Sequence, residues 1–269
     1  MLPDILNELL KLRLPACNGR KRYPGRHLVP VGFRPLSPSQ RDHADSHGEA
    51  WAFLRALDPD IALLQEAVLP VDISDTYRLR WTRAWEGKPW GSAILSRAGD
   101  LVPDWEDSSR GAVLVAHCSI PSLGRFSLAS LHARIVDRRL IPALRQTFAA
   151  LRPHLGGRFI VGGDLNTARA AARAWPENGH AEFWNTLDAS EFKDCYYTLH
   201  GVERQSYWRE WLRNKPPTIG NSLMDDHVFV DAETIAYLTD CLVWDTKEIR
   251  ELSDHGPVVV DLALPGEGG

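Results

Sequence analysis

The chain has 269 residues, 44% of them hydrophobic and 25% charged, which is enough to bury the core of one large α/β domain or of two small ones. Its formal net charge of -4 excludes the strongly basic footprint of a dedicated nucleic-acid-coating protein, but leaves room for an enzyme that contacts a phosphodiester through a few Arg and Lys side chains. The four cysteines, Cys17, Cys118, Cys195 and Cys241, are far apart and include no C-x-x-C pair, which argues against a zinc knuckle and a disulfide framework.

The N-terminal stretch carries charges among its apolar residues. MLPDILNELLKLRL contains Asp4 and Glu8, unlike the apolar region of a secretory signal, and no apolar run in the chain approaches the length needed to cross a bilayer. We therefore expect a cytoplasmic protein without a transmembrane segment, and a monomer.

Residues 1–45 are expected to form an irregular N-terminal segment. Residues 15–45 are rich in Pro, Gly and Arg and show no sustained hydrophobic period, as in a loop or a poorly ordered arm. Regular structure is expected to begin at Ser46, because Ser46 and Glu49 form a capping-box pattern ahead of apolar residues at helical spacing. The Asp-Pro pair at 58–59 ends that helix.

The rest of the chain combines many short strands with a few helices. The run IALLQE is expected to be a buried strand that delivers Glu66 to the edge of a sheet. The same pattern recurs in WGSAILSR, GAVLVAHCSI, RFSLASLHA, RFIVGG, DHVFV and GPVVVDLAL. Helices are expected near 140–151 and around Phe183 and Trp184. Because strands outnumber helices and several are consecutive, the chain favours two packed sheets with helices on their outer faces.

Polar side chains gather where these strands begin or end. They are Glu66, His132, Asp164, Asn166, Asp226, His227, Asp254 and His255. Each alone is explained by a turn, a cap or an edge position, but several carboxylates, an amide and imidazoles at strand ends together indicate a metal-assisted hydrolase.

Phosphodiester cleavage uses these residue types. Carboxylates such as Glu66 and Asp254 provide the hard oxygen ligands that Mg²⁺ prefers, and a histidine titrates near neutral pH. An Asp bonded to the far ring nitrogen fixes the imidazole, a role open to Asp226 with His255. Asp164 and Asn166 are two residues apart, so in an extended chain their side chains lie on the same side and can contact one small group together.

The segments PDIALLQE, GSAILSR, SLHA, VGGDLNT, DDHVFV and SDHGPV occur in the order, and at roughly the spacing, of the endonuclease/exonuclease/phosphatase superfamily, which includes pancreatic-type deoxyribonuclease. The resemblance covers about residues 46–264 and leaves a tail at 265–269. It implies a four-layered α/β sandwich, with two packed, mainly antiparallel or mixed sheets flanked by helices. It also implies a divalent cation, usually Mg²⁺ with Mn²⁺ as an alternative, at one end of the sheets.

The resemblance assigns roles to residues. Glu66 and Asp254 match the metal-binding positions. His255 resembles the general base or a phosphate-binding partner, oriented by Asp226. The remaining matches are Asp164 as the residue that positions or deprotonates water, Asn166 as its support and His132 as the second histidine.

The chain departs from the family at its front. Relatives begin with a strand that ends in a Trp-Asn or Tyr-Asn pair, and the nearest candidate for that Asn is Asn18, 48 positions before Glu66. A missing central strand would leave its neighbours with unpaired edges. Met224 also stands where many relatives carry Arg, which suggests a different substrate class.

The sequence leaves three alternatives for the function. In QSYWREWLRNK, the residues Trp208, Arg209 and Trp211 are candidates for a nucleic-acid-binding lip, although they equally suit the edge of the sandwich. The first alternative is a phosphodiesterase acting on nucleic acid. The others are a phosphatase or a phosphodiesterase of phospholipids or inositol phosphates, and a catalytically weakened binding or scaffold protein.

Overall fold

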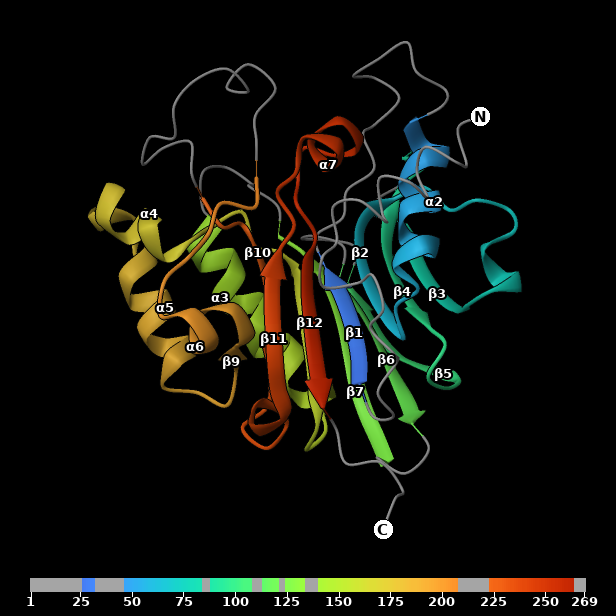
Figure 1. The fold of residues 1–269 in the computed structure, drawn as a ribbon. Helices are drawn as coiled ribbons and strands as arrows, with labels where there is room; N and C mark the ends of the chain where they lie inside the picture. Colours follow the sequence, from blue (N-terminus) through green and yellow to red (C-terminus); the bar gives the residue numbers. More distant parts are fainter. Residues whose placement is uncertain are drawn as a thin grey trace.

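The computed structural model describes residues 26–31, 46–83, 88–107, 113–120, 124–133, 140–207 and 223–263 (Figure 1). Asn18 and the candidate lip residues Trp208, Arg209 and Trp211 lie outside these ranges.

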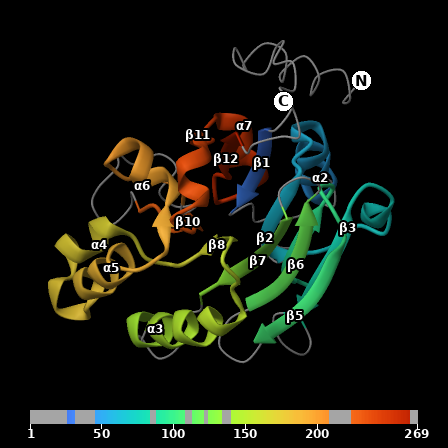
Figure 2. The ribbon, with the colours of Figure 1, turned by 90° about the horizontal axis from the view of Figure 1, so that it is seen from below.

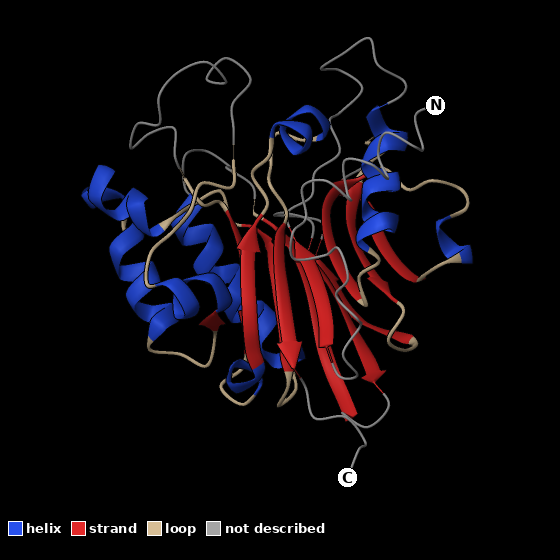
Figure 3. Cartoon of the chain, in the orientation of Figure 1, coloured by secondary structure: helices blue, strands red, loops and turns tan. Residues whose placement is uncertain are grey.

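Two six-stranded sheets form the centre of the molecule (Figure 3). The first has the order β11-β12-β1-β2-β4-β3 and the second the order β5-β6-β7-β8-β10-β9. Neighbours are antiparallel except for two parallel pairs, β1 with β2 and β7 with β8. The strands are β1 (Arg26–Val31), β2 (Ile61–Ala67), β3 (Arg78–Arg83), β4 (Gly91–Ser96), β5 (Leu101–Asp107), β6 (Val113–Ile120), β7 (Gly124–His132), β8 (Phe159–Asp164), β9 (Lys193–Asp194), β10 (Asp226–Val230), β11 (Leu238–Val243) and β12 (Val258–Ala263).

Helices cover the outer faces of the sheets, with α2 and α3 on opposite sides of the sandwich (Figure 2). The α-helices are α2 (Ser46–Leu57), α3 (Leu140–Leu151), α4 (Arg169–Ala174), α5 (His180–Asp188), α6 (Cys195–His200) and α7 (Lys247–Leu252). The short 3-10 helices are η2 (Ile73–Asp75), η3 (Arg152–His154), η4 (Pro176–Asn178) and η6 (Thr234–Tyr237). This arrangement confirms the expected sandwich. Within the described ranges, no helix is long and apolar enough to cross a bilayer.

Strand periodicity divides the buried residues into three layers. On β2, Leu63 packs between the sheets while Leu64 packs under α2, because successive side chains point to opposite faces. On β8, Ile160 likewise faces the space between the sheets and Val161 faces α3 and α5. Because both faces of these strands are covered, they read in the sequence as nearly continuous apolar runs.

The front of the chain contains a strand that the sequence analysis did not predict. β1 lies between β12 and β2, where Val31 pairs with Val258 on one side and with Leu63 on the other. The expectation of an irregular segment throughout residues 1–45 is therefore wrong at 26–31, and the central position of the first sheet is filled. The RHLVPV sequence lacks strict alternation and contains Pro30, so its pattern gave a weak strand signal.

The sheet register brings polar strand ends into one row. His132 is the partner of Asp164 across β7 and β8, and Asp164 is the partner of Asp226 across β8 and β10. Gly163 permits this register, because a Cβ there would lie 1.7 Å from the carbonyl oxygen of Leu131. In the first sheet, the C-terminal end of β2 and the N-terminal end of β12 lie at the same end of the sheet, since β1 is parallel to β2 and antiparallel to β12.

Candidate active site

A buried histidine lies between two carboxylates at the centre of the site. The Nδ1 of His255 donates to Oδ2 of Asp226 at 2.8 Å, and its Nε2 lies 4.0 Å from Oδ2 of Asp164. All three residues are at most 4% exposed. Burial lowers the pKa of His255, but Asp226, Asp164 and Asp254 outweigh this effect and raise it to about 10. The imidazole is therefore a cation at neutral pH in this arrangement.

Asp164 is held by a turn that follows β8. Its Oδ1 accepts from the backbone N–H of Asn166 at 2.7 Å, and its Oδ2 accepts from Nδ2 of Asn166 at 3.2 Å. Asn166 has a φ of 51°, a left-handed conformation that Asn tolerates better than most residues, and its Nδ2 also donates to Ala133 O at 2.7 Å. Burial and the carboxylates of Asp226 and Asp225 raise the pKa of Asp164, while His255 opposes this shift.

Glu66 reaches the site through a bulge. The register between β2 and β4 shifts between Leu64 and Ala67, and Glu66 has a φ of 51°. A bulge redirects a side chain that strict alternation would send to the other face of the sheet. The Oε1 of Glu66 lies 3.6 Å from Nε2 of His132, which in turn lies 3.8 Å from Oδ2 of Asp164.

The carboxylates suit a divalent cation. Asp254 is 9% exposed, and its Oδ1 is a buried oxygen that has no hydrogen-bond donor among the described residues. Mg²⁺ binds hard oxygen ligands of this kind. The carboxylate of Glu66, at the same end of the first sheet, is another. A second set, Asp164, Asp226 and His255, offers ligand atoms within 4.8 Å of one another. Both ring nitrogens of His255 face carboxylates and its pKa is raised, so Glu66 and Asp254 fit a cation better.

Two residues that the sequence analysis missed complete the cluster. Ser206 is fully buried; its Oγ donates to Oδ2 of Asp226 at 2.7 Å and accepts from the backbone N–H groups of Asp225 and Asp226 at 3.0 and 3.1 Å. Asp225 is 5% exposed, and burial raises its pKa. No local pattern marks Ser206, because it meets Asp226 only in the folded chain, 20 positions away.

His227 was grouped with the site by its sequence position, but it faces away from it. Its Nδ1 donates to Oδ2 of Asp194 at 3.0 Å and its Nε2 donates to Met224 O at 2.7 Å. Burial disfavours the charged ring, but Asp194 outweighs burial and raises the pKa of His227. Met224, which the sequence analysis singled out as a departure from the family pattern, packs in the core between the sheets.

Aromatic rings lie beside both histidines of the site. The ring of Tyr207 lies 4.6 Å from that of His255, and its backbone forms a β-bridge with the same residue. The ring of Trp90 lies 6.1 Å from that of His132. Both aromatic residues are half-buried. They restrict how the two imidazoles can turn.

Comparison with known proteins gives a family and a fold. The family model described as Endonuclease/Exonuclease/phosphatase family matches residues 44–255, whereas no curated protein matches the chain. Among solved structures, the endonuclease/exonuclease/phosphatase of Beutenbergia cavernae DSM 12333 has a TM-score of 0.66 at 18% identity and covers 90% of this chain and 72% of its own.

Two further structures have named activities. The AP endonuclease LMAP of Leishmania major has a TM-score of 0.65 at 18% identity, covering 89% of this chain and 88% of its own. The 3' phosphatase NExo of Neisseria, bound to a product DNA hairpin, has a TM-score of 0.59 at 18% identity, covering 88% and 99%. Identities this low establish the shared fold, and the family model supplies the class of chemistry. The chain therefore belongs to the endonuclease/exonuclease/phosphatase family of phosphoester hydrolases.

Proposed function

We propose that the chain is a divalent-metal-dependent phosphodiesterase that cleaves nucleic acid, with Mg²⁺ as its cation and Mn²⁺ as an alternative. The observation that carries the proposal is the buried imidazole of His255 between Asp226 and Asp164. A phosphodiester is an anion, and a buried imidazolium offers it a charge-assisted hydrogen bond once a phosphate oxygen approaches Nε2.

Different residues of the chain bind the cation, accept the proton from water and bind the phosphate. Glu66 and Asp254 hold the cation, which, when bound, neutralises phosphate charge and assists the leaving oxygen. Asp164, whose pKa is raised by burial, takes the proton from the attacking water, and Asn166 keeps its carboxylate in place. His132 and His255 contact the nonbridging oxygens, and Asp226 keeps His255 protonated and oriented.

The assignment of His255 favours one of the two roles implied by the family resemblance. A general base must be deprotonated at the working pH, whereas the carboxylates around His255 raise its pKa to about 10. Asp164 suits the base better, because burial raises its pKa only to about 8, so part of this carboxyl group is ionised near neutral pH while His255 stays protonated. We therefore assign phosphate binding to His255 and water activation to Asp164.

A second candidate is the same machinery acting on a small phosphate ester or a phospholipid headgroup. The net charge of -4 gives a polyanion little long-range attraction, and buried Met224 cannot donate to a phosphate. A scaffold function is disfavoured, because burying several carboxylates and a charged histidine together lowers stability, and a protein that catalyses no reaction gains nothing in return.

The test is hydrolysis of single- and double-stranded DNA, RNA, bis-p-nitrophenyl phosphate and phospholipid vesicles, with Mg²⁺ and with chelator. Wild type is compared with His255→Ala, Asp164→Asn and the control His200→Gln, which removes an exposed histidine on α6. We expect metal-dependent cleavage of nucleic acid by wild type and the control alone. A polymer substrate releases several counterions, so its KM should rise steeply with salt. Hydrolysis of headgroups or monoesters alone would support the second candidate, and no hydrolysis of any substrate would contradict both.

A further inference from the structure

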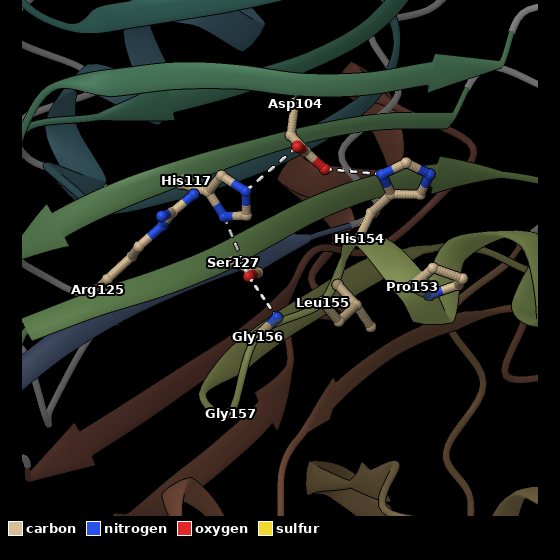
Figure 4. Close-up of a pocket in the computed structure, with 9 residues that line it drawn as sticks. All are labelled: Asp104, His117, Arg125, Ser127, Pro153, His154, Leu155, Gly156 and Gly157. Carbon is tan, nitrogen blue, oxygen red and sulfur yellow. Dashed lines mark hydrogen bonds and ion pairs between the residues drawn. The ribbon is translucent and has the colours of Figure 1, made fainter.

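A polar hollow of about 370 Å³, drawn in Figure 4, is lined by residues of β5, β6, β7 and η3. It lies at the opposite end of the second sheet from the active site. Ser127, in its lining, pairs with the first residue of β8, whereas His132, five positions later on β7, pairs with the last. At about 3.3 Å per residue, these positions on β7 are about 16 Å apart. The other polar side chains that line the hollow are Asp104, His117, Arg125 and His154. This polar cluster belongs neither to the hydrophobic core nor to the active site.

Asp104 is directed into this hollow by a bulge. The register between β5 and β6 shifts between Pro103 and Trp105, which leaves Asp104 as the additional residue on an edge strand. Bulges commonly redirect a side chain near a functional site. The neighbouring Trp105 stacks on the ring of His154, with centroids 4.7 Å apart and planes 4° apart, and thereby holds the imidazole over the bulge.

Two imidazoles approach the two oxygens of the Asp104 carboxylate (Figure 4). His154 Nδ1 lies 2.8 Å from Oδ2, and His117 Nε2 lies 3.5 Å from Oδ1. The second distance is long for a hydrogen bond. It is close to the separation of about 3.3 Å between two ligand atoms that bind one zinc ion tetrahedrally at about 2.0–2.1 Å.

His117 is fixed in the orientation that a metal ligand needs. Its Nδ1 lies 3.1 Å from Ser127 Oγ, which also accepts from the backbone N–H of Gly156 at 2.8 Å. A histidine that binds a metal through one nitrogen usually donates from the other, and this donation fixes the tautomer. With Nδ1–H donating to Ser127, the lone pair of Nε2 points toward Asp104.

We propose that Asp104, His117 and His154 form a second metal site, one that takes Zn²⁺ or a similar transition-metal ion. Two imidazoles and one carboxylate suit such ions, whereas Mg²⁺ prefers oxygen ligands, so the hollow and the active site select different cations. As the side chains stand, the three ligand atoms do not all lie within 4.8 Å of one another, so binding one ion requires a turn of the His154 ring or of the Asp104 carboxylate, each 31% exposed. The hollow leaves room for water as the remaining ligand. A bound ion would connect β5 to η3 beside the start of β8.

The test measures Zn²⁺ binding by calorimetry to the untagged, metal-free full chain in excess Mg²⁺, which occupies the carboxylates of the active site. Wild type should bind one more equivalent of Zn²⁺ than Asp104→Asn/His117→Gln/His154→Gln. The control His200→Gln should bind as wild type does, because His200 lies on α6, outside the hollow. Ser127→Ala, which removes the partner of His117 but no ligand, should bind this equivalent about 10–100-fold more weakly.

Equal zinc stoichiometry in wild type and the triple variant would overturn the proposal. Circular dichroism checks that each variant folds. If the triple variant does not fold, X-ray absorption at the zinc edge of wild type decides: two imidazoles and a carboxylate oxygen support the site, and oxygen ligands alone overturn it. Because the readout is binding in excess Mg²⁺, the result does not depend on whether the chain hydrolyses nucleic acid.

Discussion

His255 and Ser206 both donate a hydrogen bond to the same carboxylate oxygen of Asp226. Oδ2 of Asp226 accepts from both His255 Nδ1 and Ser206 Oγ, whereas Oδ1 has no donor among the described residues. Ser206 also accepts two backbone N–H groups, so a single hydroxyl satisfies the start of β10 and orients its first carboxylate. The position of His255 therefore depends on a serine that touches no substrate in the proposed mechanism.

Ser206→Ala is expected to lower kcat by about 10–100-fold, the range seen when a supporting partner of a site residue is removed. The change also leaves two buried N–H groups without an acceptor, at a cost of about 1–3 kcal/mol each. Ser206→Thr keeps the hydroxyl and should recover most of the activity. Steady-state hydrolysis of bis-p-nitrophenyl phosphate measures both variants, and equal losses in the two would show that the hydroxyl is not what matters.

The buried pair of His227 and Asp194 makes stability depend on pH. The pKa of His227 is raised, so its contribution is complete below the ordinary value of about 6.5 and is lost as pH rises through the folded value. The pKa of Asp194 is lowered by His227 against the effect of burial, so its contribution is present above about 3.9 and is lost as pH falls further. Both contributions are present between these values.

His227→Gln should therefore lower the free energy of unfolding by about 1–3 kcal/mol near pH 5.5, because it removes the nearer of the two cations beside Asp194 and leaves Arg169 at 3.8 Å. The difference from wild type should shrink at alkaline pH, where wild type loses the charge on His227. Urea unfolding of both proteins across this pH range measures it. A difference that does not change with pH would mean that the ring acts through packing alone.

Two strands, β2 and β5, position functional side chains through β-bulges. Glu66 lies in the bulge of β2 and Asp104 in the bulge of β5. A left-handed φ at a residue other than Gly costs about 1–3 kcal/mol and persists where the surrounding structure imposes it. The strain at Glu66 accompanies the position that brings its carboxylate beside His132.

Glu66→Gly is expected to raise the free energy of unfolding of the metal-free protein by about 1 kcal/mol while abolishing hydrolysis, because Gly adopts the left-handed conformation without strain. Asp58→Gly is the matched control. Asp58 has a φ of 52° between α2 and β2, at the end of β2 opposite to Glu66, and its substitution should preserve activity. Urea midpoints and rates of hydrolysis measure both. A loss of stability in Glu66→Gly would show that the carboxylate's contacts outweigh the backbone strain.

The strands that the sequence predicted most clearly are those covered on both faces. The residues of β2, β8 and β10 that lie in IALLQE, RFIVGG and DHVFV are all buried, and the apolar spacing of α3 is that of its buried face. The edge strands β3, β5 and β11 were missed, because their exposed faces carry charged or polar residues that interrupt the pattern. Polar residues at predicted strand ends gave most of the site. The role of Ser206 and the orientation of His227 away from the site could not be predicted, because they depend on contacts between segments distant in sequence.

For the whole molecule, β1 decides whether the first sheet is continuous. It is the only described link between β11-β12 on one side and β2-β4-β3 on the other. Asp254 precedes β12 and Glu66 ends β2, so the two residues assigned to the cation are held in register across this strand. The fold and the site are therefore coupled through a segment whose sequence predicted no strand.

A chain that begins at residue 46 is expected to lose cooperative unfolding, because the edges of β2 and β12 are left unpaired in the middle of the sheet. A chain that begins at residue 24 retains β1 and serves as the control. Circular dichroism during urea unfolding should show a single sharp transition for the longer chain only. A cooperative transition in the chain from residue 46 would mean that β1 is dispensable for the sandwich.

Mg²⁺ titration of bis-p-nitrophenyl phosphate hydrolysis shows whether Glu66 and Asp254 hold a cation while His255 acts on the phosphate. Glu66→Gln should require at least about tenfold more Mg²⁺ for half-maximal rate, since one carboxylate ligand is lost. His255→Gln should keep the wild-type Mg²⁺ midpoint but lower kcat by about 10²–10⁴-fold. Hydrolysis that survives chelation, or a His255→Gln variant as active as wild type, would contradict the account.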